Sequence, residues 1–200
     1  MDGNSVIKRL EKVYRKLSVK FPYPQILWDK IFYEPNDLVE AFKERASQTG
    51  IGVEVFRSMD KLEHRLKDIF ATYGRVWVCN RLRDYILGNE ILDSKSVVNN
   101  QWDADVGISL CRALIARTGS IILDSSLSRQ AGLITPQHFV IATKKQIYPD
   151  LHNYFEAVSQ EETLPSSISI ISGPSRTADI EKKLVKGAHG PASVTVLLML

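Results

Sequence analysis

The residues best suited to chemistry are small and polar, and they occupy positions 172–177 with the sequence Ser-Gly-Pro-Ser-Arg-Thr. They follow an apolar segment, 167–171, that is typical of a strand. A strand that passes through a tight turn into a capped helix presents unpaired backbone amides, and such amides bind anions. Gly173 can adopt backbone angles closed to other residues, and Ser175 or Thr177 can cap a following helix. The pattern predicts an anion site, although an ordinary capped turn has the same residues.

Two further polar segments could meet this turn. One comprises Ala-Asp-Val-Gly-Ile-Ser at 104–109 and Ile-Ala-Arg-Thr-Gly-Ser at 115–120, and the other is Gly-Ala-His-Gly-Pro at 187–191. Ligands of open α/β sheets bind beyond the carboxyl ends of the strands, so we expect a site there if the segments converge. That site would hold hydroxyls, backbone amides, carboxylates and one imidazole.

These segments carry a family resemblance. The run SGPSRTADIEKKLVKGAHGP, taken with the ADVGIS and IARTGS segments, resembles the signature of the LUD-domain family, the lactate-utilisation protein C group. The resemblance implies the fold of ribose-phosphate isomerases, glucosamine-phosphate isomerases and coenzyme A transferases. That fold is a three-layer α/β/α arrangement with a mixed, mostly parallel sheet.

The resemblance also selects candidate site residues. His189 and Asp179 are the candidate catalytic residues. The expected ligand-binding residues are Ser109, Arg117, Thr118, Gly119, Ser172, Gly173, Pro174, Ser175, Thr177 and Gly190.

Several of these residues have structural alternatives. His189 suits acid–base work or a hydrogen bond to a ligand, but it could equally bond a neighbouring turn. Asp179 could instead complement a helix dipole. Arg117 stands where the family often carries an acidic residue. It suits an anionic ligand, or it is an exposed hairpin arginine.

Composition limits the function classes. The chain has 26 Lys and Arg against 23 Asp and Glu, spread along the sequence, which does not favour a nucleic-acid surface. Cys79 and Cys111 cannot supply the four ligands of an iron–sulfur cluster, and the four histidines lack metal-ligand spacing. We therefore expect no metal site and no cofactor in this chain. Apolar runs are too short to span a bilayer, and the polar start predicts a cytoplasmic protein.

The expected organisation is an N-terminal helical arm with its connection at 1–35, followed by one LUD domain at 36–200. Strands alternate with helices over most of the domain, which predicts a parallel or mixed sheet covered on both faces. A hairpin is expected within 113–123, because Thr118 and Gly119 separate two apolar runs. A helix is expected over 177–185.

The resemblance implies a component of an iron–sulfur-dependent system that oxidises L-lactate to pyruvate. Because the chain lacks cluster ligands, the clusters are expected on partner proteins. Two alternatives remain open at this point: a free-standing isomerase-like or transferase-like enzyme, and a ligand-sensing module that binds a small anionic metabolite.

Overall fold

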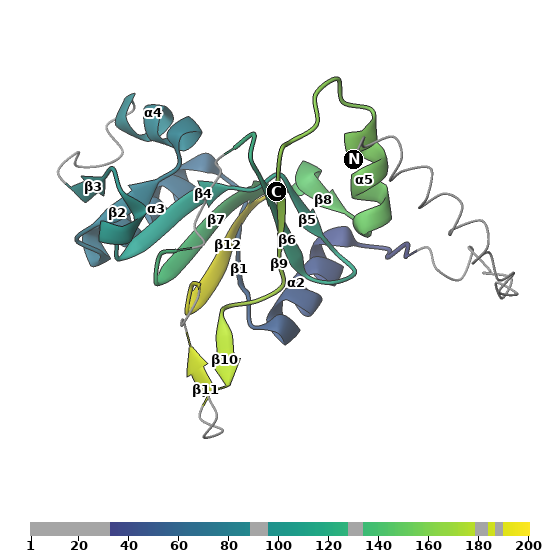
Figure 1. Cartoon of the computed structure of the whole chain (residues 1–200), viewed down its shortest axis with the longest axis horizontal. Helices are drawn as coiled ribbons and strands as arrows, with labels where there is room; N and C mark the ends of the chain where they lie inside the picture. The colour runs from purple at the N-terminus through teal and green to yellow at the C-terminus, as the bar shows by residue number, and fades with distance from the viewer. Residues whose placement is uncertain (1–32, 89–95, 128–133, 179–183, 187–189) are drawn as a thin grey trace, which may run out of the picture. The chain divides into compact units, whose positions relative to one another are not determined.

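The computed structural model describes residues 33–88, 96–127, 134–178, 184–186 and 190–200, which belong to one unit, Tyr33–Leu200 (Figure 1). Almost all of the predicted arm at 1–35 therefore lies outside the described residues. None of the described helices is long and apolar enough to cross a membrane.

A six-stranded parallel sheet forms the centre of this unit. Its strands, in spatial order, are β1 (Gly52–Phe56), β12 (Ser193–Met199), β7 (Gln137–Thr143), β4 (Val106–Leu110), β2 (Val76–Val78) and β3 (Val97–Val98). The central strands are buried on both faces, which is why their sequences are apolar without alternation. The predicted α/β fold with a mostly parallel sheet is confirmed.

Helices α3 (Met59–Thr72) and α4 (Asn80–Gly88) cover one face of this sheet. Arg65 of α3 forms a two-point ion pair with Glu54 of β1, at 2.7 and 2.9 Å, and lies over the ring of Phe139 on β7. The side chains of β1 and β7 that share this face therefore point toward α3. Helix α2 (Leu38–Thr49) begins at Asp37, whose carboxylate accepts the backbone N–H of Val39 at 2.8 Å.

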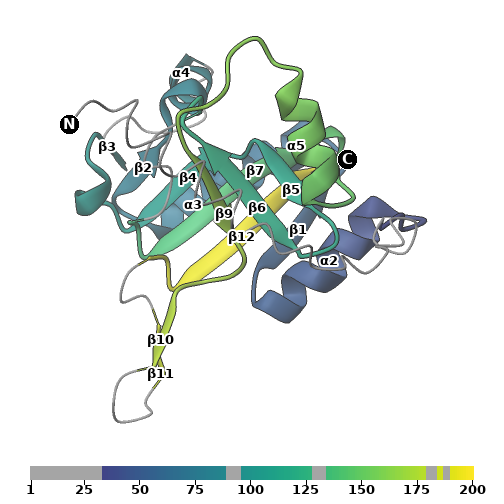
Figure 2. The same cartoon turned by 45° about the vertical axis from the view of Figure 1, so that its right-hand side comes forward.

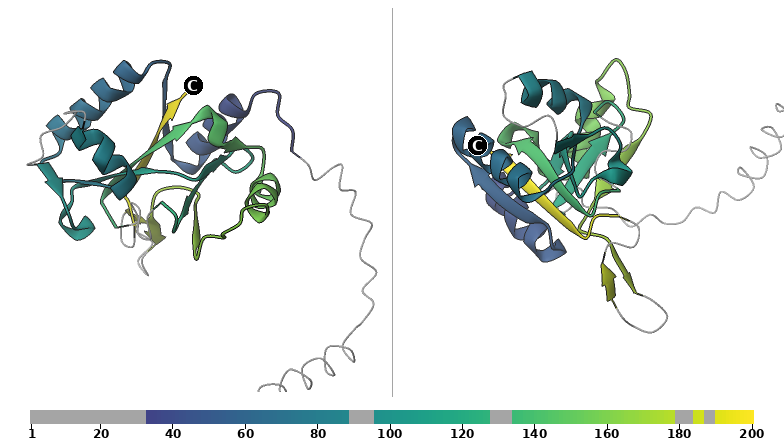
Figure 3. Two further views of the ribbon diagram at one scale, coloured as in Figure 1. Left: turned by 90° about the horizontal axis from the view of Figure 1, so that it is seen from above. Right: turned by 90° about the vertical axis from the view of Figure 1, so that its left-hand side faces the viewer.

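A second, four-stranded sheet lies against the main core. Its order is β8 (Ile147–Tyr148), β5 (Ala113–Ile115), β6 (Ser120–Asp124) and β9 (Ile168–Ile171), and β5 and β6 form the predicted hairpin. Alternate side chains face opposite ways along a strand. Leu114, Ile121 and Leu123 accordingly join the main core, whereas Ala113, Ile115 and Ile122 pack with α5 (Leu151–Ser159). The second sheet is therefore mixed, with β8 parallel to β5 and the other pairs antiparallel. Helix α5 lies on the side away from α3 (Figure 3).

The chain after β9 does not form the helix expected over 177–185. β10 (Arg176–Ala178) pairs antiparallel with β11 (Leu184–Lys186), with Thr177 opposite Val185, and this pair extends away from the sheets (Figure 2). Local propensity from Ala, Glu and Lys favours a helix, but pairing between β-branched residues overrides it. The helix prediction, and the helix start that would have supplied anion-binding amides, are wrong.

Two short 3₁₀ turns complete the described elements. They are η3 (Gln101–Asp103), which precedes β4, and η4 (Lys144–Gln146), which connects β7 to β8.

Candidate functional site

The signature segments do converge, through a chain of hydroxyl groups. The hydroxyl oxygens of Thr118 and Ser120 are 2.8 Å apart, and those of Ser120 and Ser172 are 2.7 Å apart. Ser120 is only 1% exposed, whereas Thr118 and Ser172 are exposed. The buried hydroxyl therefore joins the β5–β6 turn to the turn that follows β9.

Both of these turns pack against the C-terminal half of α2, and glycine permits the contact. Gly119 has φ 65°, and a Cβ placed there would lie 2.3 Å from the backbone nitrogen of Ala46. Gly173 has φ 134°, and its Cβ would lie 2.7 Å from the carbonyl oxygen of Thr49. Positive φ and close backbone approach both require glycine. These two signature glycines have a packing role that needs no ligand.

The third signature segment joins the same end of the main sheet. The backbone N–H of Ser175 donates to the carbonyl oxygen of Pro191 at 2.7 Å, directly after Gly190. Pro174 lies beside Gly50, which precedes β1. The convergence thus occurs at the amino ends of the main-sheet strands, whereas the expected location was beyond carboxyl ends.

The other signature residues do not join the hydroxyl cluster, or they lie outside the described residues. Thr177 lies within β10, paired with Val185. Asp179 and His189, the candidate catalytic residues, lie outside the described residues, so their roles stay predictions.

Arg117 contacts two residues that do not belong to this hydroxyl cluster. Its guanidinium lies 3.7 Å from the carboxylate of Asp150, which caps α5, and 6.0 Å from the ring centroid of Tyr33. The β5–β6 turn thereby contacts the start of α5. This geometry favours the hairpin-arginine interpretation over a ligand contact.

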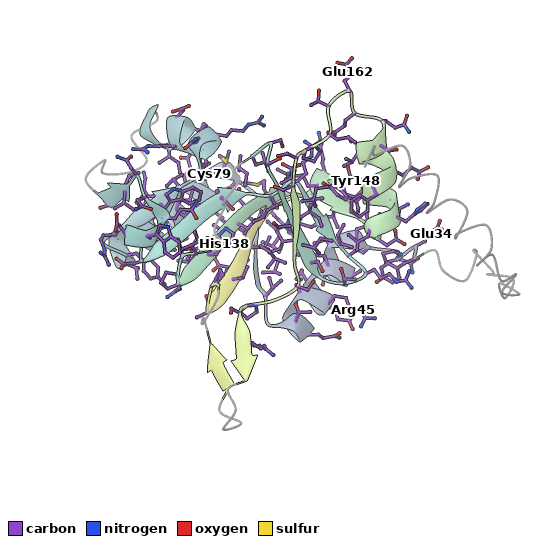
Figure 4. All side chains as sticks on the ribbon, in the orientation of Figure 1. Glu34, Arg45, Cys79, His138, Tyr148 and Glu162 are labelled. Carbon is purple, nitrogen blue, oxygen red and sulfur yellow. The ribbon has the colours of Figure 1, made fainter. Side chains whose placement is uncertain are left out.

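Ser109 has a partner that sequence reasoning missed. Its hydroxyl lies 2.8 Å from Nε2 of His138, and the two side chains are 0% and 1% exposed. His138 belongs to the neighbouring strand β7 (Figure 4). Burial lowers the pKa of His138 from 6.5 to about 4, so the imidazole is neutral at pH 7. Its Nδ1 has no hydrogen-bond partner among the described residues. The available signal was the continuous apolar run that follows His138, which is typical of a strand buried on both faces.

A neutral imidazole beside a serine hydroxyl is a pair that can take part in nucleophilic catalysis. Such chemistry requires access for a substrate. Ser109 on β4 and His138 on β7 are 0% and 1% exposed, so neither side chain is accessible from the surface. In this conformation the pair is a buried polar contact within the sheet.

The described residues contain no cluster of three or more His, Cys, Asp or Glu side chains that could hold a metal ion. Cys79 and Cys111 are each 1% exposed and unpaired. Burial raises the pKa of the Cys111 thiol to about 12, so it stays protonated at neutral pH.

Comparison with known proteins places this arrangement in a family. The family model of the LUD domain matches residues 39–199. The chain belongs to the LUD-domain family. This LUD domain has the fold of a DUF162 family protein from Deinococcus radiodurans, with a TM-score of 0.60 and 19% identity over 82% of this chain and 96% of that one.

Curated relatives align with this LUD-domain protein over different shares of its length. An uncharacterised protein of Neisseria meningitidis serogroup B is 39% identical over 48% of this chain and 42% of its own length. Lactate utilization protein C of Macrococcus caseolyticus is 29% identical over 70% of this chain and 68% of its own length. The protein of that name from Halalkalibacterium halodurans is 28% identical, over 94% and 91%. The chain thus spans less than half the length of the Neisseria relative.

Proposed function

We propose that this LUD-domain protein serves lactate utilisation as a cytoplasmic component without a redox centre, working with iron–sulfur proteins that oxidise L-lactate to pyruvate. The observation that carries the proposal is the similarity to lactate utilization protein C of Halalkalibacterium halodurans, which extends over 94% of this chain. The convergence of the signature segments at Ser120 and Ser172 supports it, because the parts that define the family also form one structural unit here.

The environment of the cysteines supports a division of labour with other proteins. Cluster ligands must be thiolates that can reach the iron, and both thiols here are enclosed by the main core. Electron transfer would then take place on partner subunits.

Growth of the host bacterium tests the metabolic role. Deletion of the gene should slow growth on L-lactate as the sole carbon source and leave growth on pyruvate unchanged, because pyruvate lies after the oxidation. A plasmid copy should restore growth on lactate. Equal growth of the deletion strain and its parent on both carbon sources would exclude the role.

Affinity purification tests the partnership separately. A tagged copy of the full chain, expressed in lactate-grown cells, should co-purify proteins that contain iron and acid-labile sulfide. The matched control is the same tag on an unrelated cytoplasmic protein. Recovery of the chain alone from cells that oxidise lactate would contradict the subunit interpretation.

A further inference from the structure

A cavity lined by three cationic side chains lies at the carboxyl end of the main sheet, away from the signature turns. Its volume is about 380 Å³, and its cationic residues are Arg81, Arg112 and Lys145. None of the described residues that line it is Asp or Glu. A concave surface with one sign of charge concentrates ions of the opposite sign. We call this space the carboxyl-edge cavity.

The cations come from three neighbouring strands. Arg81 follows the end of β2, Arg112 follows β4, and Lys145 follows β7, and these strands are adjacent in the order β7-β4-β2. Each cation is two or three residues beyond its strand, so the topology brings all three to one edge.

The connections that leave β2 and β4 diverge. The chain after β2 passes through α4 to β3 on one side, whereas the chain after β4 enters the second sheet and returns to β7 on the other side. A crevice forms where connections from adjacent parallel strands part, and ligands of open α/β sheets bind there. The position of the carboxyl-edge cavity thus matches the place where such a sheet accepts a ligand.

Arg112 is held in place by acidic neighbours outside the lining. Its Nε lies 3.5 Å from a carboxylate oxygen of Asp124, whose side chain is 1% exposed, and its other end contacts Glu161. The backbone N–H of Ser126 also donates to Asp124 at 3.0 Å, so the carboxylate is itself fixed. Arg112 lines the cavity with a guanidinium whose orientation these two carboxylates fix.

Arg81 and Lys145 are not compensated in this way. Both side chains are exposed, and neither forms an ion pair with a carboxylate of the described residues. Two uncompensated charges and one oriented guanidinium thus face the same space.

We infer that the carboxyl-edge cavity binds a small organic oxyanion, through its carboxylate or phosphate group. Guanidinium groups match the planar and tetrahedral geometries of these two groups, and the lysine adds a point charge. The inference does not rest on a role in lactate utilisation, because it follows from the charges and topology of this chain alone.

Backbone NMR of the ¹⁵N-labelled full chain tests the site, with inorganic phosphate and pyruvate added in separate titrations. At least one probe should shift the amide signals of Cys111, Arg112 and Gln146 in a saturable way. Saturation at lower concentration with phosphate indicates a phosphate ester as the natural ligand, and with pyruvate it indicates a carboxylate.

Lys145→Gln should weaken that binding about fivefold, as expected for one exposed charge pair. The adjacent Lys144→Gln is the matched control, since it removes the same charge from an exposed residue that does not line the cavity. Arg81→Gln removes another exposed charge from the lining and should also weaken the binding. Absence of saturable shifts with both probes, shifts confined to the Ser172 turn, or equal weakening by Lys144→Gln would each overturn the inference.

Discussion

The hydroxyl oxygen of Ser120 lies 2.7 Å from that of Ser172, which joins two segments 52 positions apart in the sequence. Ser120 is buried and also contacts the hydroxyl of Thr118, so it satisfies its own polar group and connects two signature turns. The family signature therefore has a structural component that is separate from any ligand.

Substitution of Ser120 by Ala should lower the free energy of unfolding by about 1 kcal/mol, because two hydrogen bonds at a buried position are lost while their other partners remain in contact with water. Urea unfolding measures the change. Ser159→Ala, at an exposed position on α5, is the control and should change the stability by less than about 0.5 kcal/mol. Equal losses in the two variants would show that the hydroxyl chain contributes nothing specific.

Gly119→Ala should be more damaging. The φ of 65° is costly for a residue with a side chain, and the new Cβ would press on the backbone of Ala46. We expect a loss of roughly 2 to 5 kcal/mol from backbone strain and overpacking together.

Gly74→Ala is the matched control for Gly119→Ala, because a Cβ there meets nothing within 4 Å and the backbone has no positive φ. Urea unfolding of both variants should show a large loss only for Gly119→Ala. If the two glycines tolerate alanine equally well, the packing role assigned to Gly119 is wrong.

Much of the fold could be predicted from the sequence, where local signals and burial agree. Asp37 caps α2 through its carboxylate, and Ser58 precedes α3 without a side-chain capping bond. The apolar run of β7 is a buried strand, whereas β1 is only partly buried. The family match over 39–199 agrees with the resemblance carried by the signature segments.

The missed features depend on contacts between distant residues. β5 and β6 form a second sheet because one of their faces packs on the main core and the other on α5. Local strand propensity does not say which face packs where. Strand pairing between Thr177 and Val185 likewise overrode a helical pattern. The three cations of the carboxyl-edge cavity follow β2, β4 and β7, and only the strand order shows that those strands are neighbours.

His189 provides a test of the signature as a functional site. His189→Ala should reduce lactate-dependent growth if the imidazole acts on a ligand, because alanine removes its proton-transfer and hydrogen-bonding capacity. His64→Ala, at an exposed position on α3, is the control. Circular dichroism and urea unfolding must first show that both variants fold. Normal growth of a folded His189→Ala strain on lactate would remove His189 from the site.

His138 should make the stability depend on pH. Its pKa is lowered to about 4 by burial, while the unfolded chain has the ordinary value of 6.5. As the pH falls below 6.5 the unfolded state binds a proton that the folded state does not, so the free energy of unfolding falls through that window. Between about pH 7.5 and about pH 5 the loss from this residue is on the order of 2 kcal/mol.

His138→Gln isolates this contribution, since glutamine does not titrate and can still bond the Ser109 hydroxyl. Urea unfolding at the two pH values should show a loss smaller by on the order of 2 kcal/mol in His138→Gln than in the wild-type protein. His64→Gln replaces an exposed histidine and should follow the wild-type protein. An unchanged pH dependence in His138→Gln would mean that the folded protein accepts a proton at this position as readily as the unfolded chain, and that the sheet opens around Ser109 and His138.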